Sequence, residues 1–152
     1  MRIAKLYLMI LALSYCALAC SMPKASDQVK PFPVGEYQYT GYDSKGTKII
    51  AGLLSITSAE PKRINSVDTI ELKGTWQLDK VGNPERIGPQ VGSGDFYGSL
   101  VNGEVRIGLN PNMNDNNVNL AGKIENGRFS GEWSYSGFAG RLNQGTFEAT
   151  KK

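Results

Sequence analysis

Few side chains in this sequence could do chemistry, because its 152 residues include no histidine and only two cysteines. Without histidine, the chain acting alone cannot form a Ser-His-Asp or Cys-His catalytic arrangement, a histidine-ligated zinc or iron site, or an imidazole acid or base. The remaining candidates are the thiols of Cys16 and Cys20 and pairs of carboxylates.

Both cysteines lie in the stretch LALSYCALACSMPKAS, at the end of a segment that is typical of a secretory signal. The segment begins with the basic residues Arg2 and Lys5, continues as an apolar run over 6–18 and ends in small residues around Cys20. The apolar run is shorter than the roughly 20 residues that a transmembrane helix needs. We therefore expect residues 1–19 to be a cleaved signal peptide.

The residues Ala17-Leu18-Ala19-Cys20 resemble the lipobox of bacterial lipoproteins, with Ala17 and Leu18 in the opposite order from the usual pattern. The resemblance implies that the signal is cut before Cys20 and that its thiol carries a diacylglyceryl group. Two or three acyl chains would then anchor the protein stably in a membrane. In the sorting rule of such lipoproteins, Ser21 rather than Asp after the cysteine implies the outer membrane, if the source is a Gram-negative bacterium.

The same residues also fit ordinary signal cleavage, because the small residues Ala17 and Ala19 flank Leu18. That alternative would release a soluble periplasmic or secreted protein. We expect lipidation, since a cysteine directly follows the cleavage site. In either case Cys16 leaves with the signal, and the mature chain has no internal disulfide.

Three segments are therefore expected: a signal peptide over residues 1–19, a lipidated tether over 20–33 and a β-barrel domain over 34–152. The tether contains three prolines and little hydrophobic periodicity. Such a composition is typical of an extended linker, which gives reach and does no chemistry.

After the tether, apolar and polar residues alternate with period two. In TIELKGTWQLDK, every second residue from Ile70 to Leu78 is apolar or glycine, as expected for a half-buried antiparallel strand. Two Asn-Gly pairs, at 102–103 and 126–127, predict type I′ hairpin turns. The pattern predicts an all-β fold with a single antiparallel up-and-down barrel of about eight strands. The strands are expected to start near Val34, Thr47, Val67, Gly94, Glu104, Asn117, Arg128 and Arg141.

Alternate connections of an up-and-down barrel lie at the same end. The turns at 102–103 and 126–127 are expected to share one end with a loop over 58–66. The longer loops over 81–93 and 110–117 are expected at the other end. Since binding residues are often carried on loops, the end with the longer loops is where a site would be sought.

A glycine and a large apolar residue recur two positions apart, as in Gly74-x-Trp76 and Gly131-x-Trp133. On one face of a curved strand, small and large side chains let opposite walls interdigitate, so a packed core is the simpler interpretation. The alternative is a cavity that holds a small apolar ligand. The residues that would line this cavity are Trp76, Phe96, Phe129, Trp133 and Phe147.

The segment KGTWQL, with Gly74-Thr75-Trp76, resembles the G-x-W motif of lipocalins and the GTW of avidins. The resemblance implies a calycin-like or streptavidin-like barrel that binds a small molecule inside. In those families the motif opens the first strand, whereas here it falls in the third predicted strand.

The net charge of +3 includes Arg2 and Lys5 of the signal, so the rest of the chain is close to neutral. Nucleic-acid binding is not expected, because it needs a basic face that neutralises phosphates. The Asn-rich run over 110–117 holds one carboxylate, Asp115, and is interpreted as a polar turn rather than a calcium loop. No metal or cofactor is expected.

An enzyme with this composition would need two carboxylates about 5–10 Å apart in one pocket. Alternation places Glu71, Asp79, Glu125 and Glu132 on solvent faces, so no convergent pair is expected. The sequence predicts a non-enzymatic cell-envelope lipoprotein whose small barrel is a binding or interaction module. Its expected partners are the membrane, through the anchor at Cys20, and either a small apolar ligand or an envelope protein. A carrier or sensor with an apolar ligand inside the barrel is the first alternative, and a carboxylate-based hydrolase is the second.

Overall fold

The computed structural model describes residues 34–113 and 115–152, and the regular structure in this part of the chain is entirely β-strand. The predicted signal peptide, Cys20 and the tether lie outside the described residues. The eight strands are β1 (Gly35–Asp43), β2 (Lys48–Ile64), β3 (Val67–Lys80), β4 (Gly92–Val101), β5 (Glu104–Gly108), β6 (Asn116–Glu125), β7 (Arg128–Gly137) and β8 (Gly140–Lys151).

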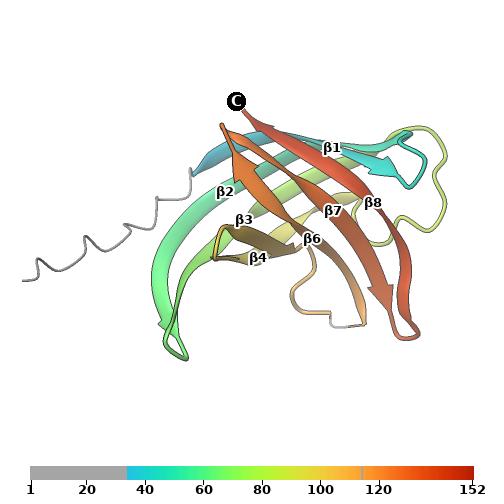
Figure 1. The fold of residues 1–152 in the computed structure, drawn as a ribbon. Coiled ribbons are helices and arrows are strands. Elements are labelled where there is room, and N and C mark those ends of the chain that lie inside the picture. The colour runs from blue at the N-terminus through green and yellow to red at the C-terminus, as the bar shows by residue number, and fades with distance from the viewer. Residues whose placement is uncertain (1–33, 114) are drawn as a thin grey trace, which may run out of the picture. The chain divides into compact units, whose positions relative to one another are not determined.

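The strands form one closed antiparallel barrel in chain order, and β8 pairs back onto β1 (Figure 1). The predicted up-and-down barrel of eight strands is confirmed, and each predicted strand start lies within two residues of the observed one. A closed barrel removes the open sheet edges that would otherwise pair with other chains.

Both predicted Asn-Gly turns have the backbone that a type I′ turn requires. Asn102 and Gly103 have φ angles of 50° and 81°, and Asn126 and Gly127 have φ angles of 51° and 77°. The first turn joins β4 to β5 and the second joins β6 to β7. These turns fix the register of the two hairpins.

The prediction of a loop over 58–66 is wrong, because β2 continues to Ile64 and only Asn65 and Ser66 form the turn into β3. This two-residue turn carries positive φ angles of 48° and 68° on non-glycine residues, so it lacks the usual Asn-Gly signal. The pairing of β1 with β2 ends at Ile56, so the part of β2 beyond Ile56 pairs with β3 alone. This part of β2 is mostly polar. A 2.8 Å ion pair between Lys62 and Glu71 links the two strands there.

Alternation along each strand places the apolar side chains inside the barrel. On β3, Ile70, Leu72, Trp76 and Leu78 are each at most 4% exposed, as predicted. Over the ranges that the structure describes, no helix has the length and apolar character to cross a membrane.

Candidate functional site

All five aromatic residues predicted to line a cavity are buried inside the barrel, and three of them, Trp76, Phe96 and Trp133, pack against glycines. On the β3–β4 pair, Gly74 lies opposite Phe96 and Trp76 lies opposite Gly94. A Cβ atom added to Gly74 would lie 2.5 Å from Cζ of Phe96, and one added to Gly94 would lie 3.1 Å from Nε1 of Trp76. The two rings therefore occupy the space that the missing side chains leave.

The β7–β8 pair repeats this arrangement. Gly131 lies opposite Phe147, and Trp133 lies opposite Gly145. A Cβ atom added to Gly145 would lie 2.7 Å from Nε1 of Trp133. The two pairs of strands therefore share one packing unit, in which a Gly-x-Trp strand pairs with a Gly-x-Phe strand and the tryptophan ring lies over the glycine of the partner strand. A Cβ atom added to Gly131, in contrast to Gly74, would meet the backbone of Ala121 and Gly122.

The indole N–H of each tryptophan, its only side-chain hydrogen-bond donor, is bonded to a backbone carbonyl inside the barrel. Nε1 of Trp76 donates to the carbonyl oxygen of Leu109 at 2.8 Å, and Nε1 of Trp133 donates to the carbonyl oxygen of Tyr42 at 2.7 Å. Because indole has one N–H, neither tryptophan keeps a free donor for a guest molecule.

The other rings pack against one another around Phe147. Phe129 meets Phe147 edge to face at a centroid distance of 4.7 Å, and Tyr39 stacks on Phe147 at 5.7 Å. The five predicted lining residues are each at most 4% exposed. Tyr37 and Tyr39 belong to the same core, and the alternation in GEYQYTGYD was the signal that could have found them.

Among the residues that the structure describes, two buried side-chain polar atoms have no hydrogen-bond partner, the hydroxyl of Tyr39 and Oε1 of Gln90. Burial raises the pKa of Tyr39 well above the ordinary value and raises the pKa of Tyr37 to about 12. Both phenols are therefore neutral at physiological pH.

A site was predicted on the longer loops, and the loop between β3 and β4 is one of them. It buries Ile87 and Gln90, and the carbonyl oxygen of its Pro89 accepts a 2.8 Å hydrogen bond from Nδ2 of Asn110. The loop is held to the neighbouring connection instead of standing open, which favours a structural role for it.

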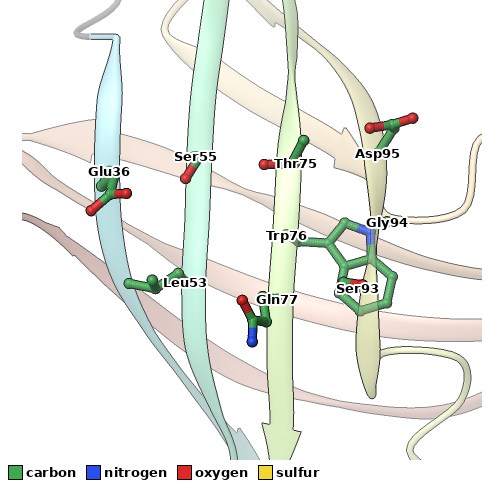
Figure 2. A pocket seen from close by; sticks show the side chains of 9 residues that line it. All are labelled: Glu36, Leu53, Ser55, Thr75, Trp76, Gln77, Ser93, Gly94 and Asp95. Carbon is green, nitrogen blue, oxygen red and sulfur yellow. The ribbon is translucent and has the colours of Figure 1, made fainter.

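The outer face of the barrel carries a hollow of about 380 Å³ across β1 to β4, which we call the outer hollow. Figure 2 shows its side chains coming from these four neighbouring strands. Two short hydroxyl side chains, Ser55 and Thr75, lie between a carboxylate on β1 and a carboxylate on β4. The residues that line it are Glu36, Leu53, Ser55, Thr75, Trp76, Gln77, Ser93, Gly94 and Asp95.

Strand register brings four of these residues into one row. Glu36 lies opposite Ser55, Ser55 opposite Thr75, and Thr75 opposite Asp95. The row is visible in Figure 2 as a line that crosses the strands. Sequence reasoning missed it because its members are spread over 60 positions and meet only through the register of three strand pairs.

The two carboxylates of the outer hollow lie on strands that are not direct neighbours. Glu36 and Asp95 are three strand spacings apart, or about 14 Å between Cα atoms at 4.8 Å per spacing. Glycosidases hold their two carboxyl groups about 5–10 Å apart. In the described part of the chain, no three His, Cys, Asp or Glu side chains come together in a way that could hold a metal ion.

The chain matches no protein-family model, no curated protein and no solved structure.

Proposed function

We propose that this protein is a non-enzymatic, lipid-anchored cell-envelope protein whose barrel is a binding module that recognises its ligand on the outside. The observation that carries the proposal is the packing of the interior. The rings of Trp76, Phe96 and Trp133 fill the space over glycines, and both indole N–H groups bond to backbone carbonyls. An interior packed in this way supports a core, and the outer hollow offers exposed polar groups instead.

Anchoring through Cys20 is the first part of the proposal to test. The full-length chain and its Cys20→Ser variant should be expressed in a Gram-negative host, and membranes separated by density centrifugation. We expect the unchanged chain in the outer-membrane fraction and the variant in the soluble fraction. Equal membrane association of the two proteins would refute the lipid anchor and would favour attachment through the barrel itself.

A carrier of a small ligand inside the barrel is the second candidate function, and one observation favours it. The Tyr39 hydroxyl and Oε1 of Gln90 are buried without partners, and a donor and an acceptor of this kind could hold a polar group of a guest. Native mass spectrometry of the purified protein separates the candidates. A small molecule that is released only on unfolding would support the carrier, whereas a protein at its bare mass supports external recognition.

A further inference from the structure

We propose that the outer hollow binds a neutral saccharide of one or two sugar rings through the row Glu36, Ser55, Thr75 and Asp95. The inference rests on the proposed external recognition and names the ligand class. The chemistry of the lining, its charge and its rigidity all favour such a ligand.

The lining offers the hydrogen-bonding groups that sugar hydroxyls need. The hydroxyls of Ser55, Thr75 and Ser93 can each donate and accept, and the amide of Gln77 does both. A carboxylate accepts charge-assisted hydrogen bonds, which are roughly twice as strong as neutral ones. A sugar hydroxyl is both donor and acceptor, so a polyhydroxylated ligand can satisfy this lining from several sides. Leu53 adds an apolar contact for the C–H face of a ring.

The charge of the hollow selects against anionic ligands. It contains two carboxylates, and none of the described residues that line it is positively charged. Glu36 is partly compensated by Nζ of Lys152 at 3.4 Å, whereas Asp95 has no ion pair within the described residues. A sugar that carries a phosphate or carboxylate would meet this uncompensated charge and be repelled.

The row is held rigidly, because its residues all lie on strands. Ser55 and Thr75 lie on the directly paired strands β2 and β3, with Glu36 and Asp95 on the flanking strands β1 and β4. Side chains whose backbone is fixed in a sheet lose little conformational entropy on binding. This favours affinity for a ligand whose hydroxyl groups match the spacing of the row.

The repeated packing unit supplies a matched control on the same molecule. The pair Thr75 and Asp95 on β3–β4 corresponds to the pair Glu132 and Thr146 on β7–β8, and both pairs are exposed. Glu132 and Thr146 have neighbours that differ from those of Thr75 and Asp95. Thr146 lies opposite Tyr42 on β1, and the Tyr42 hydroxyl donates a 2.7 Å hydrogen bond to Glu148. The pair Glu132 and Thr146 offers the same functional groups outside the hollow.

Titration calorimetry of the full-length chain tests the inference, in micelles of a detergent without a sugar head group. The probes are cellobiose, maltose and N,N′-diacetylchitobiose, with glucuronic acid as the anionic probe and spermidine as the cationic one. We expect at least one neutral disaccharide to bind, with little dependence on salt. The double variant Thr75→Val/Asp95→Ala should weaken that binding about tenfold or more.

The control variant Thr146→Val/Glu132→Ala should leave the affinity within about twofold, since it changes the same groups elsewhere. Asp95→Asn is a second, milder variant if the double variant melts early. The inference is overturned if no neutral disaccharide binds, if both double variants lose affinity equally, or if only spermidine binds and salt weakens it. Photocrosslinking at position 73 would still detect another partner on the outer face. A failure of the saccharide inference therefore leaves the proposed external recognition open to its own test.

Discussion

Trp133 on β7 reaches across β8 to bond with Tyr42 on β1, its Nε1 lying 2.7 Å from the carbonyl oxygen. The indole ring can cross β8 because the residue beneath it is Gly145. Trp76 does the same over Gly94 to reach the carbonyl oxygen of Leu109 just after β5. These two bridges tie strands that are not direct neighbours and engage both indole donors with backbone carbonyls.

The substitution Gly145→Ala should destabilise the barrel by about 3 kcal/mol, because its methyl group would strike the Trp133 ring and the Tyr42 carbonyl. Gly108→Ala is the matched control, since its methyl group would meet only side-chain ends, Nδ2 of Asn117 at 3.1 Å and Oδ1 of Asn119 at 3.6 Å, among its nearest neighbours. Urea unfolding of both variants measures the difference. A loss below about 0.5 kcal/mol for Gly145→Ala would mean that the interior has room to spare.

Removing the indole donor should also be costly. In Trp133→Phe the carbonyl oxygen of Tyr42 loses its 2.7 Å partner, and the smaller ring leaves space over Gly145. We expect a loss of about 2–4 kcal/mol in the free energy of unfolding. Trp76→Phe should behave alike, because Trp76 makes the equivalent bond to Leu109. Calorimetric melting of the two variants checks this, and a loss for only one of them would argue against a shared packing unit.

The substitution Tyr39→Phe should leave stability unchanged or raise it by about 1 kcal/mol, because it removes a buried hydroxyl that has no hydrogen-bond partner. The same unfolding measurements report the effect. A loss of more than about 1 kcal/mol would show that the hydroxyl is satisfied in solution, by water or by a guest. That result would favour the interior carrier.

Stability should fall at alkaline pH. The pKa of Tyr37 is raised by burial from 10.0 to about 12, so above pH 10 the unfolded chain loses this proton before the folded one does. The folded state then binds more protons than the unfolded state, and the free energy of unfolding decreases as the pH rises from about 10 to 12. Tyr39, whose pKa is raised in the same direction, adds to the decrease.

Urea midpoints measured from pH 8 to pH 12 test this dependence. The midpoint should be flat below pH 10, and the decline above it should be shallower in Tyr37→Phe, which cannot ionise at that position. An equally steep decline in the variant would assign the effect to other groups.

The barrel was predictable because its signals are local. Alternation along TIELKGTWQLDK and the Asn-Gly pairs specify strands and turns within a few residues. The loop over 58–66 was predicted too long, because the two-residue turn at Asn65 and Ser66 lacks the Asn-Gly pair and the strand residues before it are largely polar. The outer hollow was missed for a different reason. Glu36, Ser55 and Asp95 become neighbours only through strand register, which no single segment encodes.

Site-specific photocrosslinking in intact cells tests external recognition most directly. Benzoylphenylalanine should replace Lys73, an exposed residue on β3 next to the outer hollow, and in a control chain Ser130, an exposed residue on β7. Lys73 stands two residues before Thr75, as Ser130 stands two residues before Glu132, so the control occupies the corresponding place in the repeated unit. We expect a crosslinked adduct from position 73 and none from position 130. Adducts of equal yield from both positions would contradict recognition at the outer hollow. The absence of an adduct from position 73, in a protein that carries a small molecule inside the barrel, would contradict it as well.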